Sequence, residues 1–141
     1  MITCSSVLRA VLEVKPGGKY RILADRFEGK KFNTPNDVVL GPDGALYFTD
    51  PTLDLPKTEK QEQGFQGVYR LGTDGSVRLL IKDLNQPNGL AFSPNGKRLY
   101  VDDSRTRKVH VYDVGPNMTI GNGRVFGTEA GGARRCRRHA H

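Results

Sequence analysis

Short runs of alternating apolar and polar residues, separated by turns rich in glycine and proline, fill most of this chain. Residues 42–44 read Pro-Asp-Gly and residues 94–96 read Pro-Asn-Gly, with apolar or β-branched residues on both sides of each turn. Proline suits the second position of a β-turn, and glycine suits a position with positive φ. The pattern therefore predicts two β-hairpins, and related patterns predict two more, over residues 68–80 and 11–23.

These hairpins belong to an internal repeat. Residues 35–50 recur as residues 87–103 with one inserted residue. Two hairpins in series make a four-stranded antiparallel unit, and units that recur every 40 to 55 residues or so, about the length of known blade repeats, are typical of β-propeller blades. We therefore predict a complete blade over residues 35–81, a second over residues 87–126, and the last three strands of an earlier blade over residues 1–24.

The chain is accordingly expected to be all-β. Residues 51–66 contain two prolines and several charged or amide side chains, which predicts a long surface loop between two strands of one blade. The charged stretch at residues 57–63 is interpreted as a solvated turn rather than a binding element.

Composition limits the compartments and partners. Apolar residues make up 36% of the chain, and no segment approaches the roughly 18 uninterrupted apolar residues of a membrane-spanning helix. We find no secretory signal peptide at residues 1–8, so the compartment is unassigned and the cytoplasm is the default expectation. Cys4 and Cys136 lie near opposite ends without a metal-type spacing, which favours free thiols.

The formal net charge of +7 raises the question of nucleic-acid binding, because clustered lysine and arginine displace counterions from phosphates. The charge is concentrated at the end of the chain, however, where residues 134–138 include four arginines. The remainder is only mildly basic, and we predict no nucleic-acid partner.

Four motifs indicate a family. They are Phe-Asn-Thr-Pro-Asn-Asp-Val-Val at residues 32–39, Leu-Tyr-Phe-Thr-Asp-Pro at 46–51, Gly-Val-Tyr-Arg-Leu at 67–71 and Gln-Pro-Asn-Gly-Leu-Ala-Phe-Ser-Pro at 86–94. With these motifs in this order, residues 1–132 resemble the senescence marker protein/gluconolactonase family. The resemblance implies a partial six-bladed β-propeller of about two and a half four-stranded antiparallel blades.

The resemblance also implies a chemistry. In this family a divalent cation, often Ca²⁺ with Zn²⁺, Mn²⁺ or Mg²⁺ as alternatives, is held in the central channel by Glu, Asn and Asp side chains from different blades. Oxygen ligands of this kind suit a hard cation. The cation would polarise the carbonyl of a small-molecule lactone while a carboxylate activates water, and ring opening would give the hydroxy acid.

Two site residues follow from the resemblance. Asn88 matches the metal-binding asparagine, and Asn36 matches an asparagine that contacts the substrate. The alternative interpretation is that each is a turn asparagine whose side chain bonds its own backbone, which explains a Pro-Asn pair equally well. With the family motifs around both residues, we favour the functional interpretation.

Three departures from the family pattern affect the site. The glutamate ligand is expected before Met1, and the aspartate that is both ligand and base is expected in a Pro-Asp-Gly motif after Gly132. Residues 133–141 stand there instead, so no catalytic residue is assigned. Thr34 takes the place of an arginine that contacts substrate in some members, which weakens the expectation of a sugar lactone.

Residues 133–141 form an aberrant basic tail with two histidines and a cysteine. The segment Ala-Arg-Arg-Cys-Arg-Arg-His can be encoded by bases that read Pro-Asp-Gly-Val-Ala-Val after a shift of one base. We therefore expect a disordered or frameshifted end rather than a nucleic-acid arm or a metal site.

Three functions stay open at this point. The first is a metal-dependent lactone hydrolase in a truncated form that lacks full activity, so that the enzyme assignment itself is uncertain. The second is a non-catalytic propeller module that binds a partner, and the third is an inactive translated fragment. In each case a partial propeller leaves unpaired edges and apolar flanks, which predicts self-association.

Overall fold

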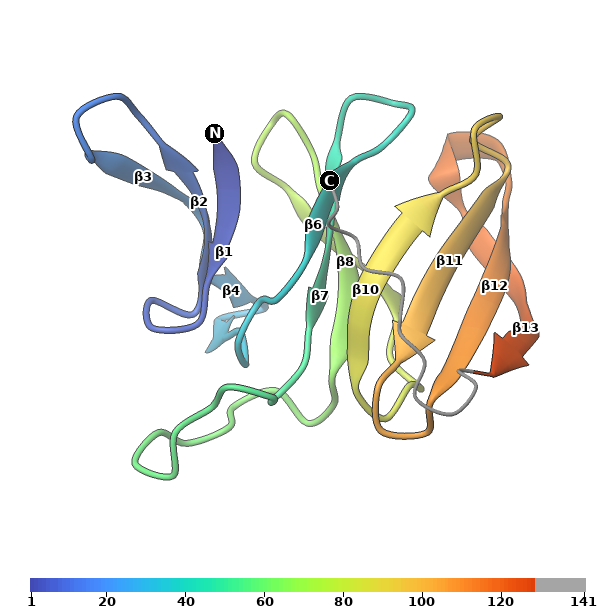
Figure 1. Cartoon of the computed structure of the whole chain (residues 1–141). Coiled ribbons are helices and arrows are strands. Elements are labelled where there is room, and N and C mark those ends of the chain that lie inside the picture. The colour runs from blue at the N-terminus through green and yellow to red at the C-terminus, as the bar shows by residue number, and fades with distance from the viewer. Residues whose placement is uncertain (129–141) are drawn as a thin grey trace.

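The computed structural model describes residues 1–128, which form three blade-like antiparallel β-sheets side by side and one small two-stranded sheet (Figure 1). The first blade contains β1 (Ile2–Ser5), β2 (Ala10–Val14) and β3 (Tyr20–Ala24). The second blade contains β6 (Val38–Leu40), β7 (Leu46–Asp50), β8 (Gly67–Leu71) and β9 (Val77–Ile81). The third blade contains β10 (Pro87–Phe92), β11 (Arg98–Asp103), β12 (Lys108–Val114) and β13 (Ile120–Thr128). The predicted all-β partial propeller is confirmed.

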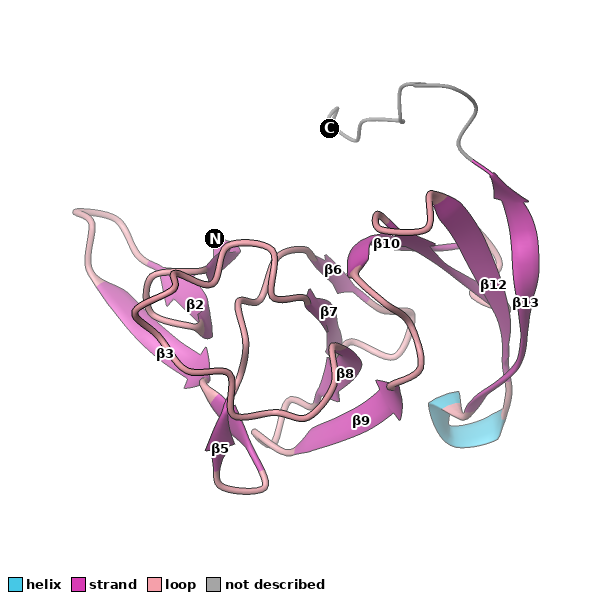
Figure 2. Cartoon of the chain, turned by 90° about the horizontal axis from the view of Figure 1, so that it is seen from below, coloured by secondary structure: helices cyan, strands magenta, loops and turns pink. Residues whose placement is uncertain are grey.

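Each blade is a simple meander, because every strand pairs with its neighbour in chain order. Viewed from below, β6 and β10 lie toward the centre of the fan, while β9 and β13 lie toward its periphery (Figure 2). The sheets therefore radiate from one side of the molecule, as propeller blades do around a channel.

Two short elements were not predicted. A two-stranded hairpin, β4 (Arg26–Phe27) and β5 (Lys30–Lys31), connects the first blade to the second, and the 3₁₀ turn η1 (Pro116–Met118) precedes β13. The predicted loop at residues 51–66 connects β7 to β8 without strand structure. No helix within residues 1–128 has the length and apolar character needed to cross a membrane.

Equivalent aspartates end the second strand of the second blade and of the third blade. Asp50 ends β7, and its Oδ2 accepts a hydrogen bond from the Asn33 amide at 2.8 Å. Asp103 ends β11 in the same way, and its carboxylate accepts bonds from the amides of Asn85 at 2.8 Å and Gln86 at 3.0 Å. The repeat thus preserves a tether between the end of the second strand and the residues that lead into the innermost strand.

Two apolar cores fill the spaces between neighbouring blades. The first-to-second core is aromatic: the rings of Phe32, Phe48 and Tyr69 lie 5.1–5.3 Å apart and are fully buried. In the second-to-third core the buried Tyr47 meets Phe92 edge-on at 4.9 Å. Side chains therefore alternate along each strand between the two boundaries of its blade.

A buried arginine fastens the long loop to the first blade. Arg9, in the turn between β1 and β2, donates from Nε to the carbonyl oxygens of Phe32 at 2.8 Å and Asn33 at 3.0 Å. Its Nη1 meets Glu59 at 3.1 Å and its Nη2 donates to the Lys60 carbonyl at 3.2 Å. Arg9 thus ties the loop at residues 51–66 to the first blade, while Glu62 and Gln63 tie the same loop to the β4–β5 hairpin.

The turn between β6 and β7 depends on a close approach. A Cβ added to Gly41 would overlap the ring of Tyr47, which is fully buried. We expect Gly41→Ala to lower the free energy of unfolding by about 1–3 kcal/mol, the usual penalty of overpacking. Urea denaturation measures this, with Gly64→Ala as a control because a Cβ at Gly64 meets no atom within 4 Å. Equal losses in the two variants would contradict the prediction.

Candidate metal and substrate site

The repeat places Asn36 and Asn88 in equivalent positions. Asn36 lies two residues before β6, and Asn88 is the second residue of β10. Both residues are partly exposed. β6 and β10 are the innermost strands of neighbouring blades, and the two asparagines lie in or next to these strands (Figure 2).

Thr49 connects the two asparagine segments. The Thr49 carbonyl accepts the Asn36 amide at 3.0 Å, and the Thr49 hydroxyl accepts the Asp37 amide at 3.2 Å. The same hydroxyl donates to the Asn88 carbonyl oxygen at 2.6 Å. A single buried threonine near the end of β7 therefore joins the segments that carry both predicted site residues.

The side chains of the asparagines are available for ligands. Within residues 1–128, neither the Asn36 nor the Asn88 side-chain amide has a hydrogen-bond partner, whereas their backbone groups are tied as described above. A turn asparagine that caps its own backbone would show such a bond. This observation argues against the turn interpretation, while the metal and substrate roles of Asn88 and Asn36 stay predictions.

Two carboxylates flank the Asn88 backbone, and sequence analysis did not single them out. Asp37, from the second blade, accepts the Leu90 amide at 3.1 Å, and Asp102, on β11, accepts the Gly89 amide at 3.0 Å. Asp37 stands inside a family motif, but its partner lies in the next blade, so only the fold shows the contact. Together they place two carboxyl groups beside the backbone that follows Asn88.

Burial raises the pKa of two further groups near these segments. Asp50 is fully buried, and burial raises its pKa to about 7, although its bond from the Asn33 amide and the nearby Arg9 charge act in the opposite direction. Burial likewise raises the pKa of the Cys4 thiol to about 12, with the charges of Asp37 and Asp50 adding to the effect. Cys4 is a free cysteine, as predicted, and stays a thiol at neutral pH. Cys136 lies outside the described residues.

The donor chemistry suits a hard cation, but the set is incomplete. An amide oxygen from Asn88, with carboxylates beside it, is of the type that Ca²⁺ accepts. Among the described residues, no group of three or more His, Cys, Asp or Glu side chains could hold a metal ion. Residues 133–141, where an aspartate ligand was sought, lie outside the described residues.

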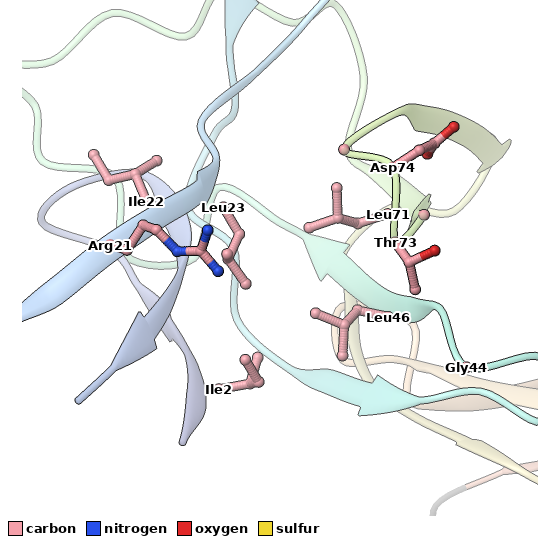
Figure 3. A pocket seen from close by; sticks show the side chains of 11 residues that line it. Ile2, Arg21, Ile22, Leu23, Gly44, Leu46, Leu71, Thr73 and Asp74 are labelled. Atoms are coloured by element: carbon pink, nitrogen blue, oxygen red, sulfur yellow. The ribbon is translucent and has the colours of Figure 1, made fainter. Parts of the chain in front are cut away.

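A cavity of about 520 Å³ lies elsewhere, between the first and second blades (Figure 3). Its walls are mostly apolar and include Ile2, Leu46 and Leu71. The charged residues Arg21 and Asp74 also line it. Neither Asn36 nor Asn88 lines it, so this cavity is separate from the candidate metal and substrate site.

Comparison with known proteins agrees with this architecture. Residues 1–135 match the family described as the SMP-30/Gluconolactonase/LRE-like region. The chain belongs to this family. A gluconolactonase of Zymomonas mobilis subsp. mobilis is 38% identical over 115 residues, which cover 77% of this chain and 32% of that protein.

Solved structures of the family share the fold. A gluconolactonase from Xanthomonas campestris superposes with a TM-score of 0.82 at 32% identity, over 89% of this chain and 44% of that one. A regucalcin from Agrobacterium tumefaciens, described as a calcium-binding protein, superposes with a TM-score of 0.64 at 22% identity, over 40% of its length. The chain thus spans less than half the length of each of these proteins, and the likeness to the regucalcin shows the fold alone.

Proposed function

We propose that this chain carries part of a divalent-cation-dependent lactone hydrolase site, in which Asn88 ligates the cation and Asn36 contacts the lactone. The observation that carries the proposal is the Thr49 bridge, which joins both asparagine segments, while neither side-chain amide has a hydrogen-bond partner within residues 1–128. Membership of a family that includes gluconolactonases supports the substrate class.

Each described residue has a distinct part in this proposal. A cation held there would supply Lewis-acid polarisation of the lactone carbonyl. Asn88 would contribute an oxygen ligand, and Asp37 and Asp102 would hold the backbone that follows it through their bonds from the Leu90 and Gly89 amides. The Asn36 amide can donate to and accept from lactone oxygens, which orients the ring. Since no general base is assigned within residues 1–128, we expect cation binding with little or no turnover from this chain.

Calcium is the cation we propose. Amide and carboxylate oxygens are the hard donors that Ca²⁺ accepts in flexible sets of six to eight, whereas Zn²⁺ favours nitrogen and sulfur ligands. Mg²⁺ and Mn²⁺ share the preference for oxygen, so a competition titration against Ca²⁺ decides among them.

The metal role of Asn88 is tested by Asn88→Ala. The substitution removes a ligand oxygen and leaves the backbone tethers in place. We therefore expect Ca²⁺ affinity to fall about tenfold or more, the size of loss seen when a residue of a metal site is removed. Isothermal titration calorimetry measures the affinity. Asn122→Ala, on the peripheral strand β13, serves as the control and should bind Ca²⁺ like the unmodified chain.

Two outcomes would count against the proposal. Unchanged affinity in Asn88→Ala would remove Asn88 from the ligand set. A chain that binds no divalent cation at all would instead favour the inactive-fragment or metal-independent binding-module alternatives. Hydrolysis of gluconolactone with and without a chelator, measured on the same samples, separates binding from turnover.

A further inference from the structure

The sequence contains three Asn-Gly pairs, at residues 88–89, 95–96 and 122–123. An asparagine that precedes glycine can undergo a slow intramolecular reaction, because glycine has no side chain to keep its amide nitrogen away from the asparagine side chain. Attack of that nitrogen on the side-chain amide carbon closes a five-membered ring and expels ammonia. Proximity favours such a reaction only where the two groups can meet. The fold therefore decides which of the three pairs reacts.

The side chains of the three asparagines differ in their contacts. Asn95 Oδ1 accepts hydrogen bonds from the Ser93 hydroxyl at 2.8 Å and from the Lys97 amide at 2.9 Å. Asn122 Nδ2 donates to a carboxylate of β12 at 2.8 Å. Within residues 1–128, the Asn88 side-chain amide has no hydrogen-bond partner. Of the three, Asn88 can thus turn its amide carbon toward the following nitrogen without first breaking a bond.

The backbone at Asn88 also departs from a regular strand. Two residues of β10, Asn88 and Gly89, lie opposite a single residue of β11, Asp102. This two-against-one arrangement is a β-bulge, which interrupts the ladder and bends the strand. In an unbroken strand the ladder fixes each peptide unit, and side chains point to alternate faces. The bulge therefore relaxes the constraint that keeps the Gly89 nitrogen and the Asn88 side chain apart.

Asp102 supplies a base for this reaction. The Gly89 amide donates its N–H to Asp102 Oδ1 at 3.0 Å. A carboxylate at hydrogen-bond distance can take that proton as the nitrogen attacks. The Gly96 amide instead donates to the Ser93 carbonyl oxygen at 2.9 Å, and a carbonyl oxygen is a far weaker base. Of these two glycine amides, the one after Asn88 is therefore paired with the base.

We propose that the bulge at Asn88–Gly89 is a site of spontaneous deamidation. The Gly89 nitrogen forms a bond to the Asn88 side-chain carbon and gives its proton to Asp102. Asp102 returns the proton as the bond to the side-chain nitrogen breaks, and ammonia leaves. Water then adds to either carbonyl carbon of the succinimide ring, which opens to aspartate or isoaspartate. Asn88 and Gly89 are partly exposed, so water can reach the ring.

The reaction changes the side chain to which a cation is proposed to bind. Aspartate at this position would offer a charged oxygen in place of a neutral one, which favours Ca²⁺. Isoaspartate would instead lengthen the backbone of β10 by one carbon. The inference does not rest on the proposed function, because none of its steps involves a cation or a lactone.

Peptide mapping of the aged 141-residue chain tests the proposal. Trypsin cleaves after Lys82 and Lys97, so residues 83–97 form one peptide that contains both Asn88 and Asn95. Fragmentation in a mass spectrometer gives the deamidated fraction at each asparagine in the same sample. In the folded chain at neutral pH, Asn88 should react faster than Asn95, whose two bonds must break first. We expect a ratio of about tenfold or more, which corresponds to a difference in activation free energy of about 1.4 kcal/mol.

The unfolded chain is the matched control. Asn88 and Asn95 both stand in the tripeptide Pro-Asn-Gly, so their local sequences are alike. In concentrated guanidinium chloride the two should therefore deamidate at nearly equal rates. Equal rates in the folded chain, or faster reaction at Asn95, would overturn the proposal.

Asp102→Asn tests the part of the base. The amide keeps an acceptor oxygen for the Gly89 N–H but cannot take its proton, so deamidation at Asn88 should slow about tenfold or more while the rate at Asn95 is unchanged. Gly89→Ala is a second variant: it keeps the N–H, residue 89 has no positive φ, and the added methyl group should hinder the attack. Circular dichroism identifies the folded variants. Deamidation at Asn88 that is as fast in both folded variants as in the unmodified chain would overturn the mechanism.

Discussion

Replacing Arg9 with methionine is expected to lower the free energy of unfolding by about 3 kcal/mol, because several buried acceptors then lose their donor. The Arg9 side chain is only 5% exposed, and its guanidinium bonds three carbonyl oxygens and the Glu59 carboxylate. Phe32 and Asn33, whose carbonyls accept from Nε, are fully buried, so water cannot replace the lost bonds.

Methionine is the informative replacement for two reasons. It fills a similar volume, so the loss reports on hydrogen bonds more than on a cavity. It also leaves the cost of the backbone conformation unchanged, since residue 9 has a left-handed φ of 55° with either arginine or methionine. Arg9→Lys retains the charge but lacks the planar fork, and we expect a smaller loss than for methionine.

The control for Arg9 is Arg21→Met. Arg21 pairs with Glu13 at 2.7 Å, but its side chain is 64% exposed, and exposed pairs contribute roughly 0–1 kcal/mol. Urea denaturation of both variants at neutral pH measures the difference. Should the two losses be equal, Arg9 would not be the anchor of the loop that the geometry indicates.

The arrangement of the blades could be predicted because its determinants are local. Pro-Asp-Gly at residues 42–44 and Pro-Asn-Gly at residues 94–96 specify tight turns, and the alternation around them specifies strands. Since the same pattern occurs twice, the repeat also indicated where one blade ends and the next begins. The β4–β5 hairpin was missed because two residues per strand are too few to show alternation.

Contacts between distant segments could not be predicted in the same way. Arg9 and Glu59 are separated by 50 residues, and Asp37 reaches Leu90 in the next blade. No pattern along the chain encodes such pairs, because they depend on how the blades lie against one another. Asn36 and Asn88 could be proposed, because each lies in a local motif. The Thr49 bridge that joins them could not, because it connects distant segments.

The second large effect concerns Asp50 and pH. Asp50 is fully buried, and while its Oδ2 accepts the Asn33 amide, its Oδ1 has no hydrogen-bond partner among the described residues. An ionised carboxylate in such surroundings is costly, which is why burial raises its pKa from 3.8 to about 7. The native state therefore holds a proton on Asp50 over a pH range in which the unfolded chain has released it.

The direction of the pH effect follows from this difference. Stability falls with rising pH wherever the native state binds more protons than the unfolded state. The contribution of Asp50 should thus be complete below pH 4, decline as the pH rises through 7, and be constant above that. Three units of pKa correspond to a change of up to about 4 kcal/mol.

Asp50→Asn isolates this contribution, because the amide keeps the shape of the side chain and cannot ionise. Relative to the unmodified chain, the variant should be of similar stability near pH 4 and more stable above pH 8. The difference between the two free energies of unfolding, plotted against pH, should therefore follow the titration of Asp50. Urea denaturation at pH 4 to 8.5 measures the difference, and Asp54→Asn, at an exposed loop position, should keep the original profile. A constant difference across this range would mean that Asp50 is ionised in the fold, with its free oxygen satisfied by a partner such as buried water.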